Sequence, residues 1–260
     1  GQAGPGVTNT VTAMANAKAA FSPVVSLAGA ISSDHKGKDA FQEVDQVSMM
    51  QAVSKKVFEV QQINEIPEVL SDAFSTAMSP RTGPVHVDLP RDELGKNAEI
   101  TKPNKYQTSP LPNALDTSLK QAFELLRDAT KPVILAGGGI KNNGDEATKH
   151  LLALAEIVNA PCATSPGHGD LIPFNHPLNA GSAGPRGSGI GTQLLKEADV
   201  ILVLGSRLGF NTTFYSYENI NKNAAIIHCE LDENSIGRYF PVAVEIFCDA
   251  VGVSKQLYQM

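Results

Sequence analysis

The sequence has few cysteines, and this scarcity restricts the chemistry open to it. Its three thiols, Cys162, Cys229 and Cys248, are odd in number and far apart. That spacing argues against a disulfide framework and against a zinc site. Cys229 and Cys248 lie in apolar, strand-like runs, so we expect small buried side chains in a protein of the reducing cytoplasm.

The sequence also lacks clustered positive charge and long apolar runs. Its 21 Lys and Arg residues are outnumbered by 27 Asp and Glu, which gives a formal net charge of −6. Nucleic acids and anionic membranes attract basic clusters, so we expect neither as a partner. No apolar run reaches the length of a membrane span, about 18 residues, and no signal-peptide pattern opens the chain. The remaining composition, 42% hydrophobic over 260 residues, is typical of one or two globular domains with normal cores.

The most distinctive stretch is the glycine-punctuated segment 29–43, GAISSDHKGKDAFQE. It follows the apolar run PVVSL, which is typical of a buried parallel strand. In open α/β sheets, ligands bind outside the carboxyl ends of such strands. The end of the segment, Phe41, Gln42 and Glu43, is therefore expected at a functional edge of a sheet.

Upstream of that strand, residues 4–9 (GPGVTN) have the composition of a turn, followed by an alanine-rich helix over 10–20. Thr8 or Asn9 is the expected N-cap of this helix, because both side chains can accept from backbone N–H groups. Glycines in the turn would also let a flat ligand approach the backbone closely. Turn, helix, strand and loop are thus predicted to form one unit.

The rest of the chain alternates between helix and strand patterns. Residues 63–78 carry apolar side chains at helical spacing, with Asn64 as the expected N-cap and Pro67 in the first turn. Residues 91–113 lack apolar periodicity, which predicts a linker and a domain boundary near residue 100. Strand and helix alternation beyond it predicts a parallel doubly wound sheet. Its expected helices span 114–127 and 145–159, its strands 132–136, 161–164, 200–204, 225–231 and 244–247, with an irregular stretch over 165–191.

Several motifs stand in a fixed order along the chain. GPGVTN precedes GKDAFQE by about thirty residues, with PVVSLAG between them. RTGPVHVDLP follows at 81–90, KPVILAGGG at 131–139 and ADVILVLGSR at 198–207. This ordered set, which covers almost the whole chain, resembles the thiamine-diphosphate (ThDP) enzymes, and among them the acetolactate synthase group most closely.

The resemblance implies an α/β fold with two doubly wound parallel-sheet domains. Residues 1–100 resemble the C-terminal part of the family's pyrimidine-binding domain, 101–113 a linker, and 114–260 its Rossmann-like central domain. In the family, a glutamate that contacts N1′ of the aminopyrimidine precedes the turn, and a third domain carries the Gly-Asp-Gly motif that helps to hold Mg²⁺ and diphosphate. Neither has a counterpart at a matching position here, so we expect a fragment of a longer protein, with the Mg²⁺ site outside this chain.

The resemblance also implies roles for residues of the first domain. Phe41 and Gln42 resemble the pair that approaches the thiazolium and the second substrate across a dimer interface, which implies a homodimer or homotetramer. Gln42 can donate to and accept from a keto acid, and Phe41 can exclude water. Arg91 stands where many acetolactate synthases have a Lys near the substrate channel. Its guanidinium binds a carboxylate with two parallel N–H groups, unlike the ammonium of Lys, so the identity of the acceptor substrate stays open. Beside the aminopyrimidine the resemblance implies Gly4, Pro5, Gly6 and Asn9.

In the central domain, acetolactate synthases carry FAD, whereas other relatives bind ADP or nothing there. Arg207 could pair with a pyrophosphate, and a carboxylate at a strand end could accept from ribose or ribitol hydroxyls. The stretch 181–189, GSAGPRGSG, departs from the acetolactate synthase pattern. FAD and an empty site therefore both stay open. The residues implied to face a nucleotide are Arg81, Gly205, Ser206, Arg207, Glu230, Asp232 and Asp249.

These patterns favour part of a ThDP-dependent transferase that decarboxylates pyruvate and passes the two-carbon unit to a 2-keto acid. A sulfoacetaldehyde acetyltransferase-like enzyme is the alternative, because FQEVDQ at 41–46 and GSRLG at 205–209 resemble that group too. The third hypothesis is a non-catalytic nucleotide-binding or dimerisation module. A glutamate upstream of the turn and a Gly-Asp-Gly motif downstream would discriminate the enzymes from the module.

Overall fold

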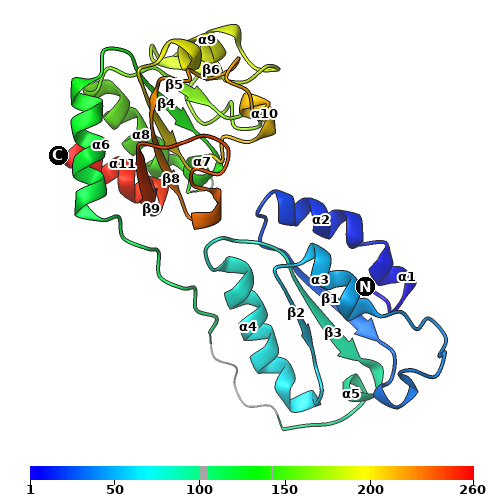
Figure 1. Cartoon of the computed structure of the whole chain (residues 1–260). Coiled ribbons are helices and arrows are strands. Elements are labelled where there is room, and N and C mark those ends of the chain that lie inside the picture. Colours follow the sequence, from blue (N-terminus) through cyan, green and yellow to red (C-terminus); the bar gives the residue numbers. More distant parts are fainter. Residues whose placement is uncertain (100–104, 142) are drawn as a thin grey trace. The chain divides into compact units, whose positions relative to one another are not determined.

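The computed structural model describes residues 1–99, 105–141 and 143–260, which divide into a first unit, Gly1–Pro110, and a second unit, Leu111–Met260 (Figure 1). Residues 101–104 of the predicted linker lie outside the described residues. Residues 105–110 belong to the first unit, where Ser75 Oγ accepts from Gln107 N at 3.0 Å and Ser79 Oγ accepts from Ser109 N at 3.0 Å.

The first unit is built on a three-stranded parallel sheet in the order β1-β3-β2, with β3 in the centre. Its central strand is buried on both faces, which is typical of parallel sheets covered by helices. The elements are α1 Pro5–Thr8, α2 Val11–Ala19, β1 Val25–Ala30, η1 Ser33–His35, α3 Gln46–Val53, β2 Lys56–Glu59, η2 Ile63–Glu65, α4 Ile66–Met78, β3 Val85–Pro90 and α5 Arg91–Leu94.

Strand alternation divides the core of this unit into two clusters. Val85 and Val87 of β3 face α4, which buries Ala73 and Ala77 against them. The opposite face of the sheet packs against α2 and α3, where Met14 and Met50 are buried with Ala28 of β1. His86 and Asp88 belong by alternation to this second face, so two polar residues of the central strand point towards the α3 side.

The second unit is a six-stranded parallel sheet in the order β6-β5-β4-β7-β8-β9. Numbered within the unit this is 3-2-1-4-5-6, the doubly wound order of Rossmann folds, with the reversal between β4 and β7. The predicted fold class is confirmed for both units. The elements are α6 Asp116–Asp128, β4 Pro132–Ala136, α7 Gly138–Lys141, α8 Asp145–Ile157, β5 Cys162–Thr164, β6 Asn179–Ser182, α9 Gly189–Glu197, β7 Val200–Leu204, α10 Phe210–Thr213, β8 Ala225–Glu230, η3 Glu233–Ser235, β9 Val244–Phe247 and α11 Ala250–Gln259.

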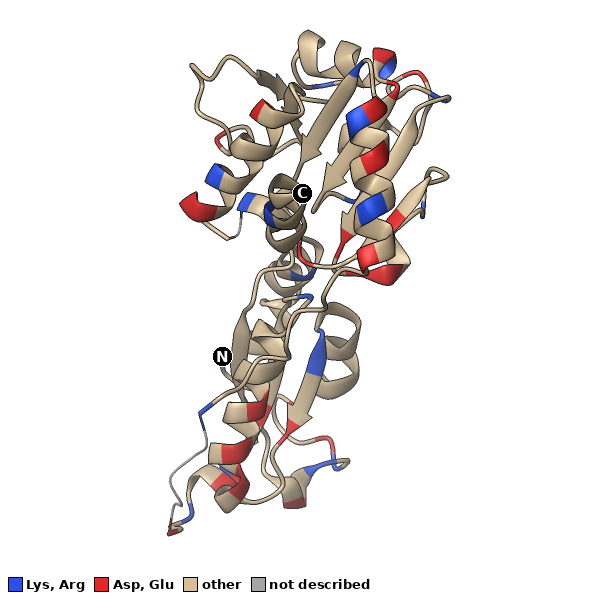
Figure 2. Ribbon diagram, turned by 90° about the vertical axis from the view of Figure 1, so that its left-hand side faces the viewer, with Lys and Arg blue, Asp and Glu red and all other residues tan. Residues whose placement is uncertain are grey.

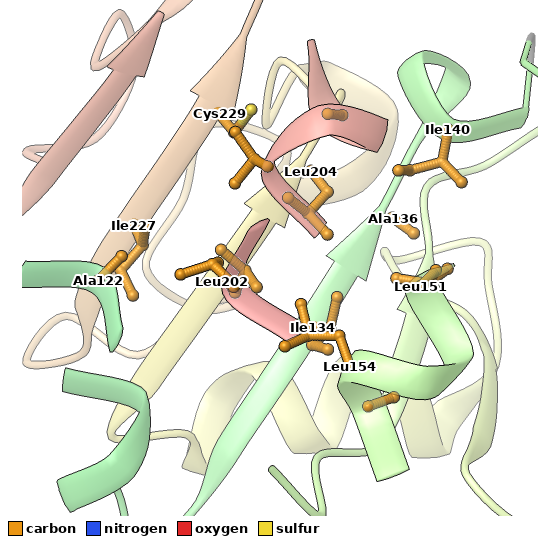
Figure 3. Close-up of a cluster of buried hydrophobic side chains, with 14 of the residues drawn as sticks. Ala122, Ile134, Ala136, Ile140, Leu151, Leu154, Leu202, Leu204, Ile227 and Cys229 are labelled. Carbon is orange, nitrogen blue, oxygen red and sulfur yellow. The ribbon is translucent and has the colours of Figure 1, made fainter. Parts of the chain in front are cut away.

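Both faces of this sheet are covered. Ile134 and Ala136 of β4 lie on one side with Leu151 and Leu154 of α8 (Figure 3). The intervening strand residues form a second cluster with Leu195 of α9 and the loop residues Ile220 and Phe240. The inner strands β5, β4, β7 and β8 are therefore buried along almost their whole length, because each position faces one helical layer or the other. The edge strands β6 and β9 are only partly buried.

Two predicted helix caps are wrong. Neither Thr8 nor Asn9 caps the alanine-rich helix, because residues 5–8 form a helical turn of their own, α1, and Thr10 is the N-cap of α2. Asn64 does not cap the next predicted helix either. Gln62 caps the preceding 3₁₀ turn, in a capping box whose other member is Glu65.

Lys and Arg are interspersed with Asp and Glu along the ribbons of both units (Figure 2). In the described part of the chain, no helix is both long and apolar enough to span a bilayer.

Candidate active site

The glycine turn and the Gln42 loop, which are far apart in the sequence, are in direct contact. Gly4 has a φ of 65°, and a Cβ placed on it would lie 2.5 Å from the Gln42 carbonyl oxygen and 3.0 Å from Gln42 Cβ. Gln42 has a φ of 65° as well. Its Oε1 accepts from Gln2 Nε2 at 3.1 Å, so Gln2 and Gly4 together hold the end of the loop in place.

The rest of the turn lies beside this contact. Pro5 is exposed and Gly6 is half-buried in the turn, and Asn9, which is also exposed, follows α1. The two motifs picked out from the sequence are therefore brought together on one surface.

The loop that carries Phe41 and Gln42 is closed by its own carboxylate. Glu43 accepts from the backbone N–H groups of Gly37 and Ala40, the latter at 2.9 Å. These backbone hydrogen bonds, that of Gly37 first, lower the pKa of the Glu43 carboxyl. Phe41 is 88% exposed, which leaves its ring accessible to a ligand or to another chain.

Arg91 lies at the same sheet edge as this loop. β1 and β3 are parallel and in register to their last residues, with Ala30 opposite Pro90, so both continue into loops on the carboxyl side. Asp92, next to Arg91, joins these loops, because its Oδ1 accepts from Ser33 N at 2.9 Å and from Ser33 Oγ at 3.3 Å. The Ser33 backbone hydrogen bond is the main cause of the lowered pKa of Asp92. Arg91 itself is exposed.

A buried polar network, which was not predicted from the sequence, lies beneath the turn. Gln46, the first residue of α3, accepts from Gly4 N at 2.7 Å and donates to Asp88 Oδ1 at 2.8 Å. His86 Nε2 is 2.8 Å from the same Asp88 oxygen, and His86 Nδ1 is 3.1 Å from Ser26 Oγ. Only the coincidence of polar residues within an apolar strand, His86 and Asp88, could have pointed to it.

In the second unit, the predicted glycine turn after β4 packs directly against Gly205 after β7. A Cβ on Gly137 would clash with the Gly205 carbonyl oxygen, and one on Gly139 would lie 2.6 Å from Gly205 Cα. Gly205 has a φ of 60°, and its carbonyl accepts from Gly139 N at 3.1 Å. These glycines thus let the ends of β4 and β7 touch. Ser206, next in the chain, is buried, and its carbonyl oxygen is 2.8 Å from His228 Nε2.

The carboxylates predicted to face a nucleotide have structural partners. Asp249 caps α11 by accepting from Gly252 N at 2.9 Å. Asp232 accepts from Ser235 Oγ at 2.8 Å and caps η3. Glu230 is 8% exposed at the end of β8, where its Oε1 accepts from Leu231 N. Arg207 is exposed beyond the end of β7.

Arg81 belongs to the first unit, whereas the other predicted nucleotide residues belong to the second. Its guanidinium carbon lies 3.4 Å from the centroid of the Phe21 ring, a cation–π contact. This contact gives Arg81 a role within its own unit.

Within the described ranges, neither a cluster of metal ligands nor an exposed thiol marks a further site. Among residues 1–99, 105–141 and 143–260, no three His, Cys, Asp or Glu side chains come together as a metal site. The three cysteines are buried, as predicted, and each is a free thiol. Burial raises the pKa of the Cys162 thiol to about 12, so this thiol stays protonated at neutral pH.

The first unit thus brings the turn and the Gln42 loop together at the carboxyl edge of its sheet, where open parallel sheets commonly bind ligands. Comparison with known families identifies it further. A model described as "Thiamine pyrophosphate enzyme, central domain" matches residues 119–257, more than half of the chain. A second, "Thiamine pyrophosphate enzyme, N-terminal TPP binding domain", matches residues 1–49. The chain belongs to the thiamine pyrophosphate enzyme family. Thiamine pyrophosphate is another name for ThDP.

Curated relatives are similar over almost the whole chain. A probable acetolactate synthase large subunit of Methanococcus aeolicus is 37% identical over 264 aligned positions, gaps included, which cover 99% of this chain and 43% of the relative. The acetolactate synthase isozyme 1 large subunit of Escherichia coli is 34% identical, over 98% of this chain and 44% of the relative. A sulfoacetaldehyde acetyltransferase of Alcaligenes xylosoxydans xylosoxydans is 37% identical, over 99% and 42%. The chain spans less than half the length of these relatives.

Proposed function

We propose that this chain supplies the pyrimidine-side and central domains of a ThDP-dependent transferase of the acetolactate synthase type. The observation that carries the proposal is the contact between the Gly4 turn and Gln42 at the carboxyl edge of the first sheet. It joins two motifs of the family on one surface. The turn offers glycine backbone and the exposed Asn9 amide, which are groups that suit a flat aminopyrimidine, and the loop offers an exposed phenyl ring beside it.

In this proposal ThDP, when bound, would supply the chemistry for decarboxylating pyruvate and transferring its two-carbon unit. The chain's own residues orient the acceptor and exclude water. Gln2 already occupies Gln42 Oε1, and among the described residues nothing accepts a hydrogen bond from Gln42 Nε2. That amide nitrogen is placed to donate to a keto-acid oxygen, while Phe41 covers the reacting region and Arg91 pairs with the acceptor's carboxylate.

The remaining parts of the assembly are proposed from the family resemblance. Mg²⁺ and the diphosphate would be held by a domain outside this chain, and the active form would be a homodimer or homotetramer in the cytoplasm. A flavin or another nucleotide in the second unit stays a prediction. Arg207 is the side chain whose charge suits a pyrophosphate. Gly205, Asp232 and Asp249 serve packing and capping within the unit.

The test is turnover by a full-length protein that carries this chain. Pyruvate should be consumed with a 2-keto acid as acceptor, and consumption should require both ThDP and Mg²⁺. Replacement of Arg91 by Lys keeps the charge but loses the bidentate guanidinium, so this turnover should fall, by about tenfold. No ThDP-dependent consumption of pyruvate with any 2-keto acid would refute the acetolactate synthase assignment.

One observation favours a second candidate, a sulfoacetaldehyde acetyltransferase-like enzyme. The relative of that name is as similar to this chain, at 37% identity, as the Methanococcus acetolactate synthase. The stretches FQEVDQ and GSRLG resemble that group as well. ThDP-dependent consumption of sulfoacetaldehyde without pyruvate would select this candidate.

A further inference from the structure

We propose that Gln46 is a positioning residue that fixes the Gly4 turn, and through it Gln42, from a buried His86–Asp88 pair. The inference rests on the proposed function insofar as this turn and Gln42 form the cofactor and acceptor side. It concerns a side chain whose two main partners, Gly4 and Asp88, each lie 42 residues away, in opposite directions along the chain.

The geometry fixes one orientation of the Gln46 amide. Its oxygen accepts from Gly4 N at 2.7 Å, and its nitrogen donates to Asp88 Oδ1 at 2.8 Å and towards the Gly29 carbonyl at 3.4 Å. A flipped amide would place a donor against the Gly4 N–H and an acceptor against a carboxylate and a carbonyl. All three neighbours therefore select the same orientation.

The pair behind Gln46 is equally constrained. A carboxylate only accepts, so His86 Nε2 donates to Asp88, and the Ser26 hydroxyl, which can donate or accept, satisfies His86 Nδ1. His86 is fully buried and Asp88 is 3% exposed. A buried polar group without a hydrogen bond is costly, so we expect this hydrogen-bonded series of side chains to act as one rigid support. Its members are Ser26, His86, Asp88 and Gln46.

The support ends at the candidate site. Gly4 N is the group that Gln46 holds, and Gly4 Cα is packed against Gln42 so closely that no Cβ fits between them. A shift of the Gly4 backbone therefore moves the surface on which Gln42 rests. By this route a residue that is 5% exposed controls the position of a side chain proposed to bind the acceptor.

The direct test measures the Gly4 amide in the 260-residue chain labelled with ¹⁵N-glycine. Gln46→Met keeps the length of the side chain and removes its hydrogen bonds, so amide exchange at Gly4 should accelerate about tenfold or more. Gln51→Met, on an exposed position of the same helix, is the matched control and should leave Gly4 unchanged. Gly83, whose N–H donates to Ala77 O in the same unit, reports general loosening. Equal acceleration at Gly4 and Gly83 would overturn the positioning role.

Gln46→Glu adds a second measurement, the pH dependence of amide exchange at Gly4, which would not change if Gln46 only filled space. Its carboxyl group can still accept from Gly4 N, but it lies against Asp88, so the two carboxyls hold the network only while they share a proton. The charged or titratable groups beside the pair are His86, Lys36, whose ammonium interacts with the Asp88 charge, and Glu59, which lies opposite Asp88 in the sheet and accepts from Lys36. The Gly4 exchange rate relative to wild type should rise with pH for Gln46→Glu and stay constant for Gln46→Met. A flat ratio for Gln46→Glu would contradict the contact with Asp88.

Turnover separates this inference from the proposed function. In the full-length protein, Gln46→Met should lower kcat/KM for the acceptor by about tenfold, whereas Gln51→Met should not. Wild-type protein without ThDP-dependent turnover would refute the proposed function and leave the amide result standing. Normal kcat/KM in a folded Gln46→Met enzyme would overturn the positioning role alone.

Discussion

Replacement of Gly4 by Ala should disturb the candidate site by two separable effects. The first is backbone strain, because Gly4 has φ 65° and ψ −109°, a conformation that L side chains rarely adopt. The second is steric, because the added methyl would lie 2.5 Å from the Gln42 carbonyl oxygen, where ordinary contact is about 3.5–4.0 Å. Both effects act on the surface where turn and loop meet.

The magnitude follows from these two contributions. A residue held in a sparsely populated backbone region costs about 1–3 kcal/mol. Forcing a methyl group into packed surroundings costs about a further 1–3 kcal/mol. The first unit should therefore lose about 2–6 kcal/mol of unfolding free energy, a large share of the stability of a small domain.

Gly37 provides the matched control. Its φ is 77°, close to that of Gly4, but a Cβ placed on it has no neighbour within 4 Å. Gly37→Ala therefore also places a side chain at positive φ but without the clash, so the difference between the two variants is attributed mainly to the contact with Gln42. We expect this difference to be about 1–3 kcal/mol.

The assay is hydrogen exchange by mass spectrometry during urea titration, read on peptides from Gly1–Pro110. This readout follows the first unit alone, since peptides of the second unit are resolved from it by mass. Equal losses of stability for Gly4→Ala and Gly37→Ala, within about 0.5 kcal/mol, would refute the steric reasoning and the close approach of Gln42 with it.

The candidate site also bears on turnover, cofactor binding and assembly. Gln42→Ala in the full-length protein should lower kcat/KM for the acceptor by about tenfold to a hundredfold with little change in Tm, through about 1–3 kcal/mol of lost hydrogen bonding, and an unchanged kcat/KM would remove Gln42 from the site. The chain alone should bind no ThDP at micromolar concentration in calorimetry, because the N1′ glutamate and the Mg²⁺ and diphosphate contacts are proposed to lie outside it. A full-length protein should sediment as a dimer or larger, and a fully active monomer would contradict the composite site.

The order of motifs and the apolar runs allowed most of the sheet to be predicted. β4 and β7 are buried runs of β-branched and aliphatic residues, β8 begins with such a run, and β9 alternates buried Val244 and Ile246 with exposed residues, so these four strands lie close to the predicted ranges. β2 was missed because Lys56–Glu59 is a short edge strand with a charge at each end. β6 was missed because Asn179–Ser182 has a turn composition, and its strand conformation comes from pairing with β5 rather than from propensity.

The candidate site was predictable as motifs but not as a contact. Nothing in the sequence states that Gly4 packs on Gln42, since that proximity depends on how residues 1–3 and α3 meet β1. Gly1 N donates to Leu27 O at 2.6 Å, and Gly29 N donates to Gly1 O at 2.9 Å, so the segment before the turn is paired with the strand edge. Gln46 escaped notice for a similar reason, because its partners are distant in sequence and its type is common on surfaces.

The glycine contact between β4 and β7 also bears on how variation among relatives should be interpreted. Gly137, Gly139 and Gly205 each fill the space that a methyl group on another would need. In a saturation-mutagenesis library, the three positions should therefore reject every substitution as a group, whether or not a nucleotide is supplied. Retention of glycine at these positions through evolution would reflect the close packing of the two strand ends. It would carry no information on whether a dinucleotide was ever bound there.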